Sequence, residues 1–92
     1  MTSLADVENR SQVADVRFER DRMHVLLQDG REISVPLWWY PRLLKATPEQ
    51  RQKWEITPFG DALHWEEIDE DLDVHGFLIG AKAPDAKAPV DA

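Results

Sequence analysis

Apolar and polar side chains alternate in three short runs between residues 13 and 37, with the period that half-buried β-strands show. The runs are VADVRF, MHVLLQ and REISVPL, and Asp29-Gly30 between the last two tolerates positive φ in a tight hairpin. Pro36 cannot donate a ladder hydrogen bond, so the third strand is expected to end there or to lie at an edge. The alternation predicts an antiparallel meander with one apolar face. Its expected inward residues are Ala14, Val16 and Phe18, then Met23, Val25 and Leu27, then Ile33, Val35 and Leu37, with Val13, Asp15 and Arg17 outward.

The segment after the meander changes to helical spacing. Its apolar stripe begins at Tyr40, continues through Leu43 and ends at Trp54. Pro48 interrupts this stripe, and Thr47-Pro48-Glu49-Gln50 has the form of a capping box with proline at the first helical position. We therefore expect two short helices, about residues 41–46 and 48–54, that cover the sheet.

The remaining segments predict further short elements. In EITPFGDALHW (55–65), Pro58 and Gly60 favour a turn between two extended pieces, a fourth and a fifth strand. In IDEDLDVHGFLIG (68–80), acids suit the start of a last helix, Gly80 suits its end, and a buried strand over 74–79 is the alternative. The expected stripe of this helix is Ile68, Leu72, His75 and Ile79. The predicted fold class is α+β: an antiparallel β-meander with one or two further short strands, covered by two to three short helices.

Length and composition indicate the domain organisation and the subcellular localisation. The 92 residues have room for one domain, which at this size buries only about 60% of the unfolded chain's surface. We expect a flexible N-terminal segment over 1–12, a single domain over 13–80 and a disordered Ala/Pro-rich tail over 81–92. The absence of cysteine fits a reducing compartment, and no apolar run approaches the roughly 20 residues of a membrane span. With no signal-peptide pattern at the start, the expected localisation is cytoplasmic and away from the membrane.

The charge is concentrated in one region. The net charge is −7; residues 1–53 hold nine Lys or Arg and eight Asp or Glu, whereas residues 54–81 hold eight acids and no Lys or Arg. An acidic segment repels phosphate, which argues against a broad nucleic-acid surface. Any such surface would be confined to the basic residues Arg42, Lys45, Arg51 and Lys53.

Histidine and carboxylate residues gather between His64 and His75, in a mixture that an oxygen- and nitrogen-ligand metal site could use. A calcium loop starting at Asp69 would need glycine at its sixth position and glutamate at its twelfth, which are Val74 and Gly80 here. There is no Gly-x-Ser-x-Gly turn and no glycine-rich phosphate loop. The sequence therefore assigns no catalytic residue, no metal and no cofactor, although a His64 general base beside a carboxylate stays open.

The stretch VPLWWYPRLLKATPEQRQKW (35–54) has two interpretations. As core, Leu37 and Trp39 continue the inward phase of the third strand, and Tyr40 and Trp54 pack over the meander. The same alternation points Trp38 away from the core, and an exposed tryptophan near Arg42 is typical of an anchor for a protein partner.

Three motifs in fixed order carry a family resemblance: DGREISVPLWWYPRLLKAT, PEQRQKW and HWEEIDEDLDVHGFLIG. Over about residues 13–80 the sequence resembles the DUF2442 family of small, mainly bacterial proteins of unknown function. The resemblance implies a small α+β domain and supplies no established catalytic residues. Some relatives carry a helix-turn-helix after this domain; others look like partners of a second small protein, DUF4160, encoded beside them in a toxin–antitoxin-like arrangement. Here only the short tail follows, Glu66 replaces an expected proline after the His-Trp pair, and the loop before it is poorer in glycine.

The leading hypothesis is a small cytoplasmic interaction or regulatory module that binds a protein partner, such as a DUF4160-like protein. Its expected partner-binding residues are Trp38, Tyr40, Arg42, His64, Asp69, Glu70 and Asp71. The alternative is a metal- or ligand-binding enzyme centred on His64, Asp69, Glu70 and Asp71. A third hypothesis, nucleic-acid binding by the basic helix, ranks lower because the protein is acidic, and a free sheet edge is compatible with a homodimer.

Overall fold

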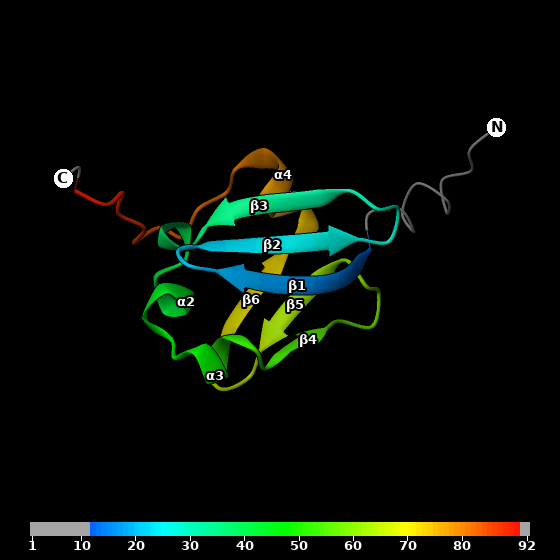
Figure 1. Ribbon diagram of the computed structural model, residues 1–92, viewed down its shortest axis with the longest axis horizontal. Coiled ribbons are helices and arrows are strands. Elements are labelled where there is room, and N and C mark those ends of the chain that lie inside the picture. The colour runs from blue at the N-terminus through cyan, green and yellow to red at the C-terminus, as the bar shows by residue number, and fades with distance from the viewer. Residues whose placement is uncertain (1–11, 91–92) are drawn as a thin grey trace.

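Between residues 12 and 90, the part of the chain that this computed structural model describes, six strands form two three-stranded antiparallel sheets (Figure 1). The first sheet has the order β1-β2-β3 and the second the order β4-β5-β6, so each is a meander in chain order. Their bounds are β1 (Val13–Glu19), β2 (Arg22–Leu27), β3 (Glu32–Pro36), β4 (Trp54–Ile56), β5 (Ala62–Trp65) and β6 (Glu70–Asp73).

Short helices connect and flank the sheets. A 3-10 turn, η1 (Leu37–Trp39), and the helices α2 (Pro41–Lys45) and α3 (Pro48–Arg51) join β3 to β4, and α4 (Val74–Ile79) follows β6. In Figure 1 the second sheet passes behind the first with its strands at an angle to those of the first. The α+β fold class is confirmed, and the second sheet contains three short strands.

One hydrophobic core lies between the two sheets. The first sheet and η1 supply most of its residues, β5 supplies Leu63 and Trp65, and the helical segments close it from the side. Such side-chain burial is the main stabilising contribution in a domain of this size. The buried residues are Val13, Val16, Met23, Val25, Leu27, Val35, Leu37, Tyr40, Leu43, Leu63, Trp65, Val74 and Phe77.

The predicted meander is confirmed in its turns and in most of its phase. Gly30 has φ 93° in the β2–β3 turn, where its N–H donates to the Leu27 carbonyl at 3.0 Å. Strand β3 lies at the edge of its sheet and ends at Pro36, as the missing proline N–H requires. The inward residues of β2 are all buried, as is Val35 in β3.

The predicted phase of β1 is wrong at its first two residues. Val13 pairs with Leu27 and Asp15 with Leu26, so β1 contains one extra residue, a β-bulge at Ala14. The bulge turns Val13 inward, where it is 2% exposed, and leaves Ala14 exposed. From Val16 onward the expected phase holds.

The second predicted helix is shorter than expected. Its capping box is confirmed, because the Thr47 hydroxyl accepts from the Gln50 N–H and the Gln50 side chain accepts from the Thr47 N–H. The helix nevertheless ends at Arg51, and Trp54 opens β4, where it pairs with Trp65. Expecting Trp54 on a helical stripe was therefore wrong. The alternation of Trp54, Glu55 and Ile56 serves a strand equally well, and pairing with β5 decides between the two.

The last predicted helix divides into a strand and a helix. Residues 70–73 form β6, and α4 begins only after Asp73, whose carboxylate accepts from the Gly76 N–H at 2.6 Å. Gly80 ends α4 with φ 74°, as expected. The expected stripe was wrong, since Val74 and Phe77 are the buried residues of α4 and Ile79 is 63% exposed.

The two ends of the chain differ in what the structure describes. The predicted flexible segment 1–12 lies, except for Gln12, outside the described residues. Residues 81–90 form neither helix nor strand, and the Ala83 N–H donates to the Trp39 carbonyl at 3.0 Å. Within residues 12–90, none of the helices has both the length and the apolar character that crossing a membrane requires.

Candidate functional site

A cleft of about 550 Å³ runs along β6, within the range of roughly 300–1,000 Å³ that is typical of ligand sites. All four residues of β6 line it. The opposing walls are the start of α2 with Tyr40, one side of α4, and residues 81–85 of the C-terminal segment. We call it the β6 cleft. Of the predicted partner-binding residues it holds Tyr40, Arg42, Glu70 and Asp71.

Tyr40 is positioned by the change of chain direction after β3. Strand pairing stops at Pro36, η1 turns the chain, and Pro41 starts α2, which holds Tyr40 at the junction. Tyr40 is 3% exposed, and its ring meets that of Phe77 edge to face at 6.2 Å between centroids. Burial, and then the charges of Glu70 and Asp73, raise the pKa of Tyr40 to about 12. The phenol is thus a neutral hydrogen-bonding group at one wall of the cleft.

Glu70 carries a carboxylate at the inner side of the cleft. It pairs with the buried Trp65 across β5 and β6, so its side chain points toward the core side of the sheet. Burial raises the pKa of Glu70, while the hydrogen bond from the Asp71 N–H at 3.1 Å and the charge of Arg42 oppose that rise. A half-buried carboxylate of this kind favours a cationic partner group.

Arg42 lies at the mouth of the cleft on the first turn of α2. Its guanidinium Nη1 donates to the backbone carbonyl of Asp69 and lies 3.8 Å from the Asp69 carboxylate. The side chain of Arg42 is 59% exposed and that of Asp69 is 89% exposed. The contact fixes the β5–β6 turn against α2, and Arg42 keeps donors free for a further acceptor.

His64 lies on the outer face of the second sheet, with Glu55 and Asp71 beside it on the neighbouring strands. Its Nδ1 is 2.6 Å from Asp71 Oδ1 and its Nε2 is 2.7 Å from Glu66 Oε2. These hydrogen bonds, the one to Glu66 first, raise the pKa of His64 to about 9. At neutral pH both ring nitrogens therefore donate, so the imidazolium presents no lone pair to a metal or to a substrate proton.

The four residues of the enzyme alternative do not converge on one point. Glu70 and Asp71 are neighbours in a strand and point to opposite faces, and Asp69 lies in an exposed turn held by Arg42. Within the described part of the chain, no group of three or more His, Cys, Asp or Glu residues is placed to hold a metal ion. The cluster that the sequence suggested is divided between a cleft, a sheet face and a turn.

The tryptophans beside Tyr40 lie outside the cleft. Trp38 is half-buried and meets Trp39 edge to face at 6.4 Å between ring centroids. Trp39 packs against the core, and Lys82 Nζ lies 4.9 Å from its ring centroid, within the range of a cation–π contact. The expected strand alternation of these residues ends because η1 replaces strand after Pro36.

Three of the four basic residues that could have formed a nucleic-acid surface, Arg42, Arg51 and Lys53, have local partners. Arg51 donates to the carbonyls of Leu43 and Leu44, at 2.9 and 2.8 Å. Lys53 Nζ lies 3.6 Å from a Glu67 carboxylate oxygen, and Arg42 contacts Asp69. Each contact lowers the positive potential available to phosphate.

Sequence reasoning missed the far wall of the cleft. The predicted stripe of the last helix omits Phe77, which lines the cleft, and residues 81–85 fall in the predicted disordered tail. A short Ala/Pro/Lys segment has no hydrophobic period to show that it lies against another element. The one residue of this segment whose type suggests a contact with the domain is Lys82, because a cation that follows a helix cap can pack on a tryptophan ring.

Comparison with known proteins places this fold among uncharacterised bacterial proteins. The profile of a family described as a protein of unknown function, DUF2442, matches residues 13–83. A crystal structure of a protein of unknown function from Rhodospirillum rubrum is 31% identical with a TM-score of 0.69, covering 82% of this chain and 93% of that one. The solution structure of an uncharacterized protein from Chromobacterium violaceum is 22% identical with a TM-score of 0.68, over 92% and 87% of the two chains, which shows a shared fold. No curated protein matches the chain significantly.

Proposed function

The chain belongs to the DUF2442 family of proteins of unknown function, and we propose that it is a small interaction module that binds a protein partner through the β6 cleft. The observation that carries this proposal is the cleft itself, which brings an aromatic wall, an exposed arginine, the half-buried Glu70 and three exposed acids to one place. Aromatic and arginine side chains are enriched in protein interfaces.

The charges of the cleft indicate a partner segment with positive charge. Four acids line it, Glu70, Asp71, Asp73 and Asp85, against two cations, Arg42 and Lys82. Complementary charge speeds the encounter of two proteins and selects between partners. The cleft therefore favours a basic partner segment, with Arg42 available for one acceptor group.

The biological setting of the proposal is a cytoplasmic pair of proteins encoded together, in which a DUF4160-like protein is the partner. Its support is the family membership and the arrangement that the family resemblance implies. Trp38 is not part of the cleft wall, so replacing it tests whether the interface extends beyond the cleft.

The decisive experiment captures the partner from the native cytoplasm. Tagged protein is incubated with nuclease-treated extract, and bound proteins are identified by mass spectrometry. The Trp38→Ala, Arg42→Ala double variant is expected to lose the partner and to stay folded by circular dichroism, although it melts at a lower temperature because it also loses the Trp38–Trp39 and Arg42–Asp69 contacts.

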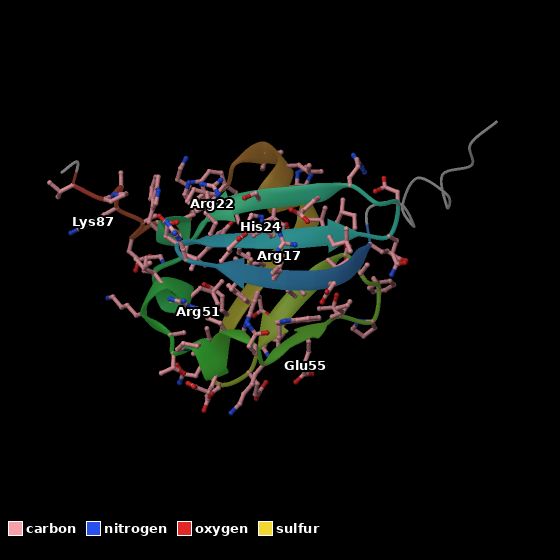
Figure 2. The ribbon with its side chains drawn as sticks, viewed as in Figure 1. Arg17, Arg22, His24, Arg51, Glu55 and Lys87 are labelled. Atoms are coloured by element: carbon pink, nitrogen blue, oxygen red, sulfur yellow. The ribbon has the colours of Figure 1, made fainter. Side chains whose placement is uncertain are left out.

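A matched control changes a cation on another face. Arg17 lies on β1, with its side chain 57% exposed on the outer face of the first sheet (Figure 2). Arg17→Ala is expected to retain the partner. If the double variant retains the partner as well as the Arg17 variant does, the interface lies elsewhere and the proposal is wrong.

A further inference from the structure

Strand β6 is an edge of the second sheet, and its open side faces the β6 cleft. The sheet order β4-β5-β6 leaves β6 paired on one side only. The C-terminal wall of the cleft bonds to η1 through Ala83 and Trp39, not to β6. An edge strand beside a cavity along its whole length is a template for a further strand.

The register shows which backbone groups face the cleft. The Val74 N–H donates to the Asp61 carbonyl at 2.9 Å, so the pairs Leu63–Leu72 and Trp65–Glu70, two and four steps away, are the hydrogen-bonded pairs of this ladder. The pairs Ala62–Asp73 and His64–Asp71 between them are not. The backbone groups of Asp71 and Asp73 therefore point away from β5.

Two of these groups have no partner within residues 12–90. The Asp71 N–H donates to the Glu70 side chain at 3.1 Å, whereas the Asp71 carbonyl accepts no hydrogen bond from any described residue and the Asp73 N–H donates none to one. One residue of a parallel strand placed opposite Leu72 would bond to both, and an antiparallel strand would use the same groups. Peptide recognition by strand addition uses backbone groups of this kind.

The negative charge of β6 indicates which kind of strand can pair with this edge. Three of its four residues are acidic, so a second copy of the chain pairing through the same edge would bring carboxylates together. Like charges opposite each other across a strand pair are destabilising, whereas opposite charges are stabilising. A basic strand is complementary to this edge, and a second copy is not.

We propose that the partner enters the β6 cleft as an extended segment of alternating basic and apolar residues, which adds to β6 as a fourth strand of the second sheet. This rests on the proposed function. Basic side chains on one face would lie beside Asp71 and Asp73, and apolar side chains on the other would lie toward Leu72 and Phe77.

The test uses a defined probe, a blocked peptide of alternating lysine and valine, titrated into isotopically labelled full-length protein and followed by NMR. The Asp73 amide is expected to shift and to become protected from solvent exchange, with the Leu72 amide, already bonded to β5, as internal reference. A peptide with the same side chains but N-methylated at alternate residues is expected to bind about tenfold or more weakly, since its backbone bonds cannot form.

Two charge-reversal variants test the edge itself. Asp71 and Glu55 flank His64 on the same face of the sheet, on opposite edge strands, and Figure 2 shows Glu55 on β4. Asp71→Lys is expected to weaken binding of the lysine–valine peptide by about tenfold or more. Glu55→Lys is expected to leave the affinity within about twofold, because Asp71 lies on the cleft edge and Glu55 does not.

Three results would overturn strand addition: no binding of the lysine–valine peptide, equal binding of the N-methylated peptide, or binding without protection of the Asp73 amide. If a glutamate–valine peptide bound as tightly as the lysine–valine peptide, the inference that the partner strand is basic would be wrong. None of these results removes the proposed function, which the partner capture with the Trp38→Ala, Arg42→Ala double variant tests separately.

Discussion

The guanidinium of Arg51 donates through Nε to the backbone carbonyl of Leu43 at 2.9 Å, eight residues earlier in the chain. Its Nη2 donates to the next carbonyl, that of Leu44, at 2.8 Å. These carbonyls belong to the last turn of α2, a helix of five residues, and the Leu43 carbonyl also accepts from the N–H of the C-cap residue Ala46 at 3.2 Å. The Arg51 carbonyl in turn accepts from the indole of the buried Trp65 at 3.0 Å. Arg51 therefore joins α2 to the second sheet.

Removing the Arg51 side chain should destabilise the fold. Arg51→Ala leaves two carbonyls without a charged donor, and we expect a loss of about 2 kcal/mol in the free energy of unfolding, measured with urea. Lys53→Ala is the control, because its ion pair with Glu67 is exposed and should contribute at most about 0.5 kcal/mol. Equal losses in the two variants would show that Arg51 does not hold α2.

His64 should make stability depend on pH. Its pKa is raised from 6.5 to about 9 by Glu66 and Asp71, so its contribution is full below about pH 6.5 and is lost as pH rises through 9. The melting temperature should therefore fall across this window, and His64→Gln should remove that part of the slope. An NMR titration of the His64 ring with a midpoint near 6.5 would show that the two contacts do not form in solution.

Tyr40 should resist ionisation in the folded protein. It is the one tyrosine of the sequence, so phenolate absorbance reports it alone. Its pKa is raised from 10.0 to about 12, so the contribution to stability is full below pH 10 and is lost as pH rises through 12. Glu70→Gln should lower this midpoint because it removes one of the nearby charges. A midpoint near 10 in protein shown by circular dichroism to be folded would contradict the burial of Tyr40.

Gly80 should tolerate few replacements. It ends α4 with φ 74°, and an added Cβ would meet only a Trp39 ring carbon, at 3.9 Å. Space is therefore available, and the cost of Gly80→Ala comes from the left-handed backbone, about 1 kcal/mol in the free energy of unfolding. Gly80→Asn should cost less, because asparagine adopts this conformation more readily. Equal losses for alanine and asparagine would point instead to the Trp39 contact.

The first sheet could be predicted almost completely because its signals are local. Alternation fixes which face of a strand is buried, and Asp29-Gly30 fixes the hairpin. The exception is the bulge at Ala14, which depends on the pairing of β1 with β2 and leaves no mark in the sequence of β1 alone. The capping box at Thr47 was predictable for the same local reason.

The second sheet could be predicted only in part. Strands β4 to β6 have three or four residues each, too short to establish a period. Acids at Glu70 to Asp73 suit a helix start as well as an edge strand, and only pairing with β5 separates the two. The sequence identified four residues of the β6 cleft by chemical type, and it missed the far wall because residues 81–85 have no apolar pattern.

The two sheets follow one another along the chain without exchanging a strand. The first sheet, β1 to β3, ends at residue 36, and the first strand of the second sheet, β4, starts at residue 54. Each ladder therefore closes only short loops, which costs little chain entropy and favours rapid folding. A backbone cut between Gln52 and Lys53 would leave every ladder intact, and the halves would be joined by side-chain packing and by hydrogen bonds such as those from the Val13 N–H to the Gly60 carbonyl and from the Trp65 indole to the Arg51 carbonyl. Two such fragments, mixed in solution, are expected to complement one another, so the domain is a natural starting point for a split reporter.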